Sequence, residues 1–499
     1  MAVTANKHSP HGRTALAGAL FMALGFTSTA QALDWDFVPS VGASATYTDN
    51  ANQSATNPED ALILSVSPGF SLTSKGSRRV QASVNYRLSG VARFGEDQST
   101  DLNHNLGAAG KAELIEDFLF IDGSARISQE LISLFGSPAD ADINDSNRAT
   151  VGTYSISPYI QKRFGTFANA QARYTTGGAI FENDVASDSN TNTFSAGLTS
   201  GTRFNDLSWG LNYSISKTDS DTTDNTFERA SATVGYALTR KFRVFGTVGQ
   251  EWNDYLSTTG TDGSSYSAGF GWSPTRRTSV EASMGERYFG NTYSLSGSHR
   301  ARKSTWTIRY SEDVSDISQL ATNFNDLQLV QIACPAGVVL PTNPTLFDLI
   351  NAGCDVNLFY GTSITNGVFI SKLLTAGVSW NLSSKTILSM TLSDLTREYQ
   401  LVNQGEDRVQ SATGSISYRM SPQTTASGSL SFTRNSADAL AAGGTAREDD
   451  LINLSLGLTH SFAEKLSGAL TFRHTERDSN EATADYQENS LTATVNMRF

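Results

Sequence analysis

Apolar and polar residues alternate with a period of two along most of the chain. In residues 80–88 the even positions are Val, Ala, Val, Tyr and Leu, and the odd positions are Gln, Ser, Asn and Arg. The same alternation recurs in residues 207–215, 411–418, 452–459 and 491–499. Because successive side chains of a β-strand point to opposite faces, this pattern predicts strands with one apolar and one polar face.

The predicted strands are long enough to cross a membrane. They run for about ten residues, the length of a tilted transmembrane strand, whereas soluble strands average about five or six. Their polar positions are mostly Ser, Thr, Asn, Gln and Arg, which suits a water-filled lumen. Because an open sheet edge is untenable in lipid, we expect the sheet to close.

Connector lengths predict the topology. Counted back from the C-terminus, long connectors such as 475–488 and 436–450 alternate with short ones such as 462–465. We therefore expect an all-β fold, a transmembrane antiparallel up-and-down β-barrel of about 22 strands, within a range of roughly 18 to 24. An even number places both termini on the periplasmic side. The least secure hairpin is the short connector at 289–291, which falls among the long ones.

The first 32 residues have the organisation of a signal peptide. Two basic residues precede an apolar run at 15–26, and an A-x-A pattern ends at Ala32. Residues 33–499 would then form a single barrel without an N-terminal plug domain, because the first strand begins within about five residues of the cleavage site. No later segment is apolar enough for a transmembrane helix.

The C-terminal strand ends on an aromatic residue. Val495, Met497 and Phe499 alternate with polar residues. This ending resembles the terminal signature strand of bacterial outer-membrane proteins, which the barrel-insertion machinery recognises. We therefore expect an outer-membrane location in a Gram-negative cell, with membrane lipid and the insertion machinery as partners.

Charge is segregated between the two kinds of connector. The 499-residue chain has a formal net charge of −12, which opposes nucleic-acid binding. Long connectors are acidic, as at 140–145 and 448–450, and short ones are basic, as at Arg240 and Lys241. We favour an interpretation in which the basic turns face anionic phospholipid of the periplasmic leaflet. The alternative is a solubilising surface with no relation to lipid.

Both cysteines, Cys334 and Cys354, lie in the longest predicted connector, 315–366. An even cysteine pair in an exported protein predicts a disulfide, although two free thiols are the alternative. Closing about 20 residues would stabilise the loop by about 3 kcal/mol. The loop also has apolar stretches, so we expect it to cap or enter the lumen from outside. The alternative is an exposed loop that binds polysaccharide or a partner.

The chain offers little for catalysis or cofactors. Its four histidines beyond residue 32 lie near strand ends at outward positions, where an interfacial role is favoured over a catalytic one. No G-x-S-x-G, H-E-x-x-H or C-x-x-C-H motif occurs, so no enzyme activity, cofactor or haem is expected. The acidic stretch from Asp140 resembles the start of a calcium loop, but Asp145 and Val151 replace its Gly and Glu, so no metal site is expected. The histidines are His104, His299, His460 and His474.

Nine arginines fall at inward positions of the predicted strands. Inward acids on the same strands are fewer, with Asp122 and Glu281 among them. A basic lumen favours the transit of anions. The arginines could equally brace the wall by pairing with neighbouring Ser and Asp, and both roles can hold at once. The nine are Arg87, Arg126, Arg173, Arg287, Arg309, Arg397, Arg419, Arg473 and Arg498.

Three short segments carry a family resemblance. Residues 37–41, 47–50 and 125–132 are similar to outer-membrane barrels associated with the PEP-CTERM sorting system. That family is encoded beside exopolysaccharide and exosortase genes. The resemblance implies a role in envelope or exopolysaccharide export, with polysaccharide export components as possible partners. It carries over no catalytic or binding residue.

The leading expectation is a non-enzymatic, porin-like outer-membrane channel tied to exopolysaccharide or PEP-CTERM export. The main alternative is a structural anchor or receptor whose outer loops bind polysaccharide or partner proteins. An energy-coupled transporter would also use 22 strands, but the short start before the first strand argues against its plug. An outer-membrane enzyme would be recognised by loss of activity on replacing His104 or His474.

Overall fold

The computed structural model describes most of the chain beyond residue 33. The predicted signal peptide, residues 1–32, lies outside this part. The described residues are 34–95, 98–137, 143–144, 146–182, 186–221, 223–322, 331–333, 355–357, 367–401, 405–438, 445–481 and 483–499.

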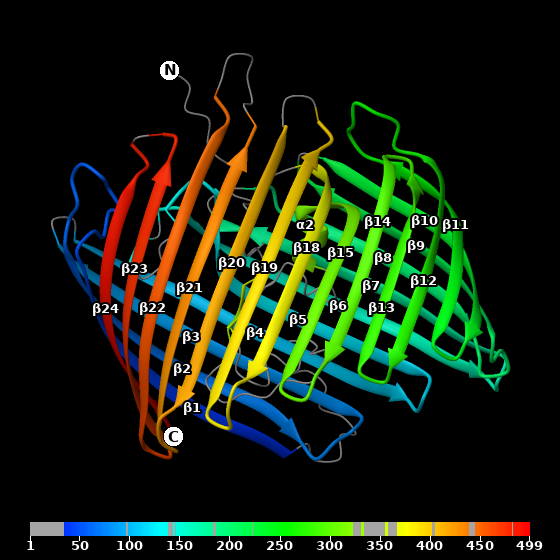
Figure 1. Ribbon diagram of the computed structural model, residues 1–499. Helices are drawn as coiled ribbons and strands as arrows, with labels where there is room; N and C mark the ends of the chain where they lie inside the picture. Colours follow the sequence, from blue (N-terminus) through cyan, green and yellow to red (C-terminus); the bar gives the residue numbers. More distant parts are fainter. Residues whose placement is uncertain are drawn as a thin grey trace, which may run out of the picture.

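Twenty-two antiparallel strands form one closed sheet, which confirms the predicted fold (Figure 1). Each strand pairs with its neighbours along the chain, and β1 pairs with β24 from Ser40–Arg498 to Thr48–Ser490. The strands are β1 (Asp34–Thr48), β2 (Ala61–Lys75), β3 (Val80–Phe94), β4 (Ser99–Ile115), β5 (Leu119–Leu131), β6 (Arg148–Phe164), β7 (Ala168–Phe181), β8 (Ser189–Ser200), β9 (Leu207–Ser220), β10 (Asp224–Thr239), β11 (Phe242–Asp254), β12 (Gly263–Thr275), β13 (Thr278–Arg287), β14 (Gly290–Arg300), β15 (Ser304–Asp316), β18 (Val368–Asn381), β19 (Thr386–Tyr399), β20 (Glu406–Arg419), β21 (Thr424–Ala437), β22 (Arg447–Ala463), β23 (Leu466–Ser479) and β24 (Tyr486–Arg498).

The barrel has two different ends. At the turn end, β1 begins, β24 ends and the short connectors lie; at the loop end, the longer connectors lie. The short connector near 289–291 is a true hairpin at the loop end, in which Arg287 pairs with Gly290. Gly290 has a backbone φ of +120°, a conformation that residues with a Cβ rarely adopt.

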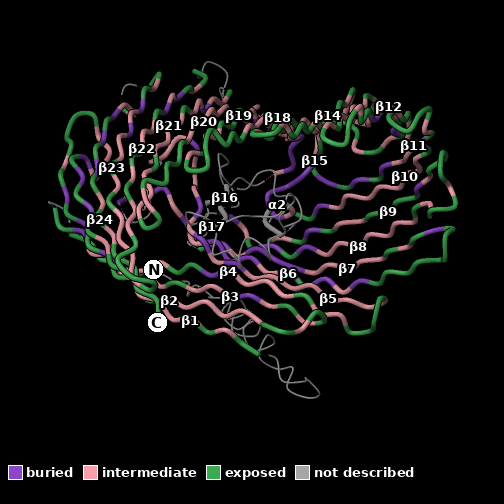
Figure 2. The backbone as a smooth tube through the Cα atoms, turned by 60° about the horizontal axis from the view of Figure 1, so that its bottom comes forward, coloured by how far each residue is buried: buried purple, intermediate pink, exposed green. Residues whose placement is uncertain are grey.

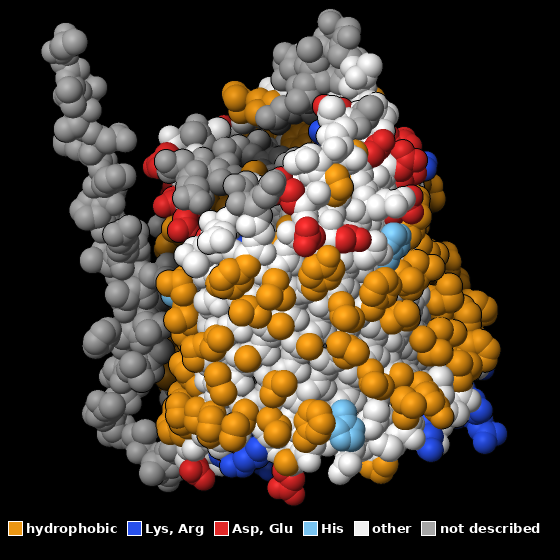
Figure 3. Space-filling view, turned by 90° about the vertical axis from the view of Figure 1, so that its left-hand side faces the viewer, with side chains coloured by type: hydrophobic (Ala, Val, Ile, Leu, Met, Phe, Trp, Pro, Cys, Tyr) orange, Lys and Arg blue, Asp and Glu red, His pale blue; other side chains and the backbone are white. Residues whose placement is uncertain are grey.

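The outer face carries an apolar belt that begins at the turn end. On β19, Leu388, Met390 and Leu392 face outward, and the next outward residue is Asp394. Other strands change from apolar to polar at a similar distance from their turns, about ten residues along, which gives a belt about 25 Å tall. Figure 3 shows this belt with Lys and Arg along its turn-end edge and most Asp and Glu toward the loop end.

Some elements do not belong to the barrel wall. The short helix α2 (Ile317–Thr322) follows β15 and contacts β6, β7 and β8. Figure 2 places α2 inside the ring of strands. Further along, β16 (Gln331–Ala333) pairs with β17 (Asp355–Asn357). No plug domain occurs among the described residues, and none of their helices is long and apolar enough to cross a membrane.

The pairing of β1 with β24 can be tested by cross-linking. Ala43 and Val495 are register partners. We expect Ala43→Cys with Val495→Cys to form an intramolecular disulfide on oxidation, which alters the mobility of the heat-unfolded chain on a denaturing gel until it is reduced. The matched control, Val66→Cys with Val495→Cys, places the thiols two strands apart and should not cross-link. Equal cross-linking of both pairs, or only intermolecular products, would contradict the closed sheet.

Candidate functional site

The inner wall of the barrel is lined by hydroxyl groups that hydrogen-bond in pairs between neighbouring strands. These pairs satisfy polar groups on the wall and stabilise cross-strand register. The wall is therefore hydrophilic but largely uncharged over wide areas. The pairs, with oxygen–oxygen distances, include Thr46–Thr492 (2.9 Å), Ser124–Ser155 (2.8 Å), Ser157–Thr175 (2.6 Å), Thr193–Ser216 (2.9 Å), Thr233–Thr247 (2.9 Å), Ser283–Ser294 (2.7 Å) and Ser393–Ser411 (2.8 Å).

Arg287 is the centre of an ion-pair cluster on this wall, in which Arg287 and Glu251 are buried and Asp313 is exposed. Its Nε and Nη2 donate to the two carboxylate oxygens of Glu251 at 2.7 and 2.8 Å, and Nη1 donates to Asp313 at 2.8 Å. Glu251 is only 1% exposed. Such a bidentate contact fixes the planar guanidinium in one orientation. Arg287 therefore ties β13 to β11 and β15.

Arg397 forms a similar buried pair. Its Nε donates to Asp407 at 2.8 Å, its side chain is 1% exposed, and its guanidinium lies near the rings of Phe369 and Tyr399. Neighbouring strands β18, β19 and β20 supply these groups. The contact braces the wall toward the loop end.

Two further arginines are held on the wall formed by β5, β6 and β7. Arg173 donates to Asp122 at 2.9 Å, and its guanidinium lies 3.9 Å from the centre of the Tyr159 ring. Arg126 donates to Ser128 at 3.2 Å and lies 3.6 Å from Glu130. Both contacts support the bracing role for these arginines.

The other five predicted arginines occupy inward positions in a different setting. Within the described part of the chain, no ion pair is formed by Arg87, Arg309, Arg419 or Arg498. Arg473 does have an interaction partner. Arg419 and Arg498 end their strands at the turn end. An anion-attracting role stays a prediction for these positions.

Most of these acidic partners lie on strands other than that of their arginine, so the acids on the same strand do not reveal them. Arg287 on β13 reaches Glu251 on β11, and Arg173 on β7 reaches Asp122 on β5, each across an intervening strand. Asp122 is the register partner of Ser157 on β6. The small Ser157 side chain on β6 leaves room for the long Arg173 side chain to reach Asp122. A small residue on the strand between them was therefore the available sequence signal for this ion pair.

The connector between β5 and β6 turns into the lumen at the loop end. We call its described residues, 132–137, 143–144 and 146–147, the inward loop. Asn435 donates to the Leu134 carbonyl at 3.0 Å, and Arg477 donates to the Phe135 and Gly136 carbonyls at 2.7 and 3.1 Å. The loop thus reaches from β5 to β21 and β23.

The contact surface for the inward loop is a buried charge cluster, Arg447–Asp449–Arg477. Both arginines pair with Asp449, which has no exposed surface. Arg447 also donates to the Phe135 carbonyl at 3.1 Å, with its guanidinium 4.9 Å from that ring's centre. A Cβ at position 136 would lie 2.1 Å from the Asn147 side chain, so a larger residue than Gly136 would have to displace Asn147.

Other residues of the inward loop pack against β2, β3 and the connector between β1 and β2. Ile143 joins Ile63 and Val91 in a buried apolar cluster. Asn144 donates to the Ala51 carbonyl at 3.3 Å. The inward loop therefore covers inner-wall residues of β2 and β3 as well as touching β21–β23.

The connector after β15 also starts toward the lumen. The backbone nitrogen of Gln319 donates to Asp316 at 2.8 Å, and Asn225 of β10 donates to the same carboxylate at 3.1 Å. These contacts fix the direction in which α2 leaves the wall. The rest of the predicted 315–366 loop is described only in β16 and β17, and Cys334 and Cys354 lie outside the described residues.

The histidines are each held by one polar side chain on a neighbouring strand. His104 contacts the Tyr86 hydroxyl at 2.8 Å, and His474 contacts the side-chain Oδ1 of Asn489 at 2.8 Å. His299 and His460 contact threonine hydroxyls in the same way. In the described residues no group of three or more His, Cys, Asp or Glu could hold a metal ion. Asp140 lies outside those residues.

The closed 22-strand sheet, the apolar belt and the polar inner wall together define an outer-membrane β-barrel. Residues 370–499 match the family described as "Putative beta-barrel porin 2". No curated protein sequence matches the chain.

Solved structures show the same fold at low sequence identity. The FrpB iron transporter from Neisseria meningitidis, in its apoprotein form, has a TM-score of 0.50 and 10% identity, covering 96% of this chain and 83% of its own. A mutant ferric enterobactin receptor, PfeA from Pseudomonas aeruginosa, in complex with enterobactin, has a TM-score of 0.50 and 9% identity, with coverages of 94% and 82%. These similarities concern the barrel fold alone.

The inward loop should be released by removing its contact surface. Hydrogen bonds to charged groups are worth about 1.5–3 kcal/mol each, so Arg447→Ala with Arg477→Ala should free residues 133–137. We expect faster hydrogen exchange in these residues and larger current fluctuations in planar bilayers. Arg434→Ala, which removes an outward ion pair with Asp450 between β21 and β22, is the control. Unchanged exchange in the double variant would show that the loop is held by other contacts.

Proposed function

We propose that the protein is a non-enzymatic outer-membrane channel that passes hydrophilic polymers or ions. The observation that carries this proposal is the inner wall, where paired hydroxyls and arginines replace the apolar residues of the outer face. The match of residues 370–499 to a porin family supports transport rather than catalysis.

We place the turn end in the periplasm and the loop end outside the cell. The apolar belt begins directly at the short turns, and their Lys and Arg side chains lie at its edge. Basic residues gain roughly 1 kcal/mol each beside an anionic lipid surface, which favours the phospholipid leaflet for this end. Both termini would then be periplasmic, because an even number of strands puts them at the same end of the barrel.

The cargo we assign is exopolysaccharide, in association with a PEP-CTERM system. The sequence resemblance in residues 37–50 and 125–132 gives this role, and the chemistry of the lumen agrees with it. Hydroxyl-lined walls and scattered guanidinium groups can exchange hydrogen bonds with a hydroxyl-rich, uncharged or anionic polymer. Polysaccharide export components at the turn end would be the partners.

The loop end would restrict passage through two inward segments, the inward loop and the connector that begins with α2. For the second segment we propose the disulfide Cys334–Cys354 that the sequence predicts. The β16–β17 register supports it, since Ala333 pairs with Asp355, and in the sequence Cys334 directly follows Ala333 and Cys354 directly precedes Asp355. The disulfide would keep this hairpin compact at the mouth of the lumen.

Conductance tests the channel directly. The refolded protein should form stable open pores in planar bilayers. Arg87→Gln with Arg309→Gln should lower the anion-to-cation permeability ratio, because these side chains face the lumen without carboxylate partners in the described residues. Arg434→Gln, on the outer face, should leave the ratio unchanged. Absence of conductance at any voltage, also after deletion of residues 334–354, would refute the channel.

The second candidate is a receptor or structural anchor, favoured by the two inward segments at the loop end. Deleting residues 334–354 separates it from the channel. For a channel with a restricting loop, single-channel conductance and antibiotic uptake should rise. Unchanged permeability together with lost binding of surface polysaccharide would assign the loop to a receptor.

A further inference from the structure

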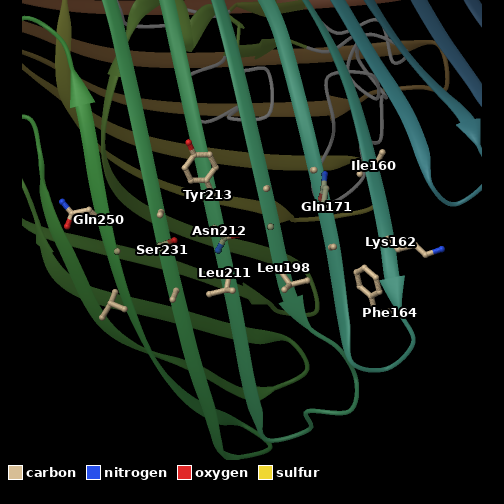
Figure 4. Close-up of a pocket in the computed structure, with 18 of the residues that line it drawn as sticks. Ile160, Lys162, Phe164, Gln171, Leu198, Leu211, Asn212, Tyr213, Ser231 and Gln250 are labelled. Atoms are coloured by element: carbon tan, nitrogen blue, oxygen red, sulfur yellow. The ribbon is translucent and has the colours of Figure 1, made fainter.

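The outer wall over β6–β11 contains a trough within the apolar belt. It encloses about 900 Å³ and runs across neighbouring strands, from Lys162 and Phe164 on β6 to Gln250 on β11 (Figure 4). Phe164, Leu211 and Val248, which line it, are 53%, 51% and 63% exposed and share the outward parity of the belt. The trough therefore faces lipid rather than the lumen.

Strand register shows why the wall is hollowed here. Two adjacent rows of outward residues cross the six strands, and alanines form much of their floor. Larger side chains border the alanines at both ends of the rows and at their middle, where Leu198, Leu211 and Tyr213 lie. The row nearer the turn end is Lys162, Ala170, Leu198, Leu211, Ala232 and Val248, and the next row is Ile160, Ala172, Ala196, Tyr213, Ala230 and Gln250.

The trough has the length of a lipid chain. Five steps between strands, at about 4.8 Å each, give roughly 24 Å. One leaflet of the hydrocarbon core is about 15 Å thick, so an acyl chain lying along the rows is accommodated over its whole length. The rows begin three residues from the β6–β7 turn and rise along the wall toward β11.

A single cation stands at the turn-end limit of the trough. Lys162 is exposed, lies 5.9 Å from the centre of the Phe118 ring, and has no acidic partner among the described residues. Other outward Lys and Arg residues of the described strands lie toward the loop end, beyond the belt. These are Arg148, Lys217, Lys372, Arg408 and Arg434.

We propose that the trough is a binding site for an anionic glycerophospholipid of the turn-end leaflet. The lipid phosphate contacts the Lys162 ammonium, and one acyl chain lies on the alanine floor toward Gln250. Charge complementarity and the apolar lining select this occupant over a second copy of the chain, which would have to bury Lys162. The site is separate from the lumen and does not depend on what the channel carries.

Lipid retention measured by native mass spectrometry tests the site. The detergent-purified full chain is mixed with equal amounts of phosphatidylglycerol and phosphatidylethanolamine. The unaltered protein should retain phosphatidylglycerol preferentially. Lys162→Gln should lower the ratio of the two bound lipids about fivefold, the effect expected for one lysine near an anionic surface. Ala172→Leu with Ala230→Leu should fill the trough and remove both lipids.

Two controls keep the result interpretable. Lys217→Gln removes an outward lysine near the loop end, and Ala282→Leu enlarges an outward alanine on β13. Both should bind lipid like the unaltered protein, and heat-dependent gel mobility checks that every variant is folded. Unchanged lipid retention in Lys162→Gln or in the filled-trough variant would overturn the proposal. A dimer that disappears in the filled-trough variant would assign the trough to a second copy instead.

Discussion

Closure of the sheet is the constraint on which the rest of the structure depends. In lipid an unpaired backbone amide or carbonyl costs several kcal/mol, so a spanning sheet cannot leave an edge. The β1–β24 pairing removes both edges at once. Closure also separates two environments, because each strand must then present alternate residues to lipid and to the enclosed space.

The outer and inner faces of the sheet meet different surroundings and carry different side chains. Outside, apolar side chains form a belt whose edge coincides with the short turns, and polar residues such as Asp394 mark its other limit. Inside, polar groups cannot all rely on water, and the hydroxyl pairs and the Arg287–Glu251 contact satisfy them within the wall. The ion pairs of Arg287 with Glu251 and of Arg173 with Asp122 also connect strands that are not adjacent, which helps to fix the strand register.

The sequence was sufficient to predict the barrel strands, but it was insufficient to predict the arrangement of residues at the mouth of the lumen. Alternation with a period of two is a local signal, so residues 80–88 or 207–215 reveal their strands without knowledge of their neighbours. The partner of Arg173 on β5 depends on register, which no single strand contains. The connector between β5 and β6 has the acidic stretch 140–145, and nothing in its sequence indicates that its described residues fold inward. Arg447 and Arg477, which hold it, are more than 300 residues away in sequence.

The central claim is that one wall separates lipid from a water-filled lumen. Spin labels placed singly at residues 208–216 of β9 measure this directly through collision with oxygen or with a water-soluble nickel complex. The account predicts two accessibility profiles of period two and opposite phase. Odd positions such as Leu211 and Tyr213 should be accessible to oxygen, and even positions such as Asn212 and Ser214 should be accessible to nickel. Profiles in the same phase, or even positions closed to the nickel complex, would contradict it.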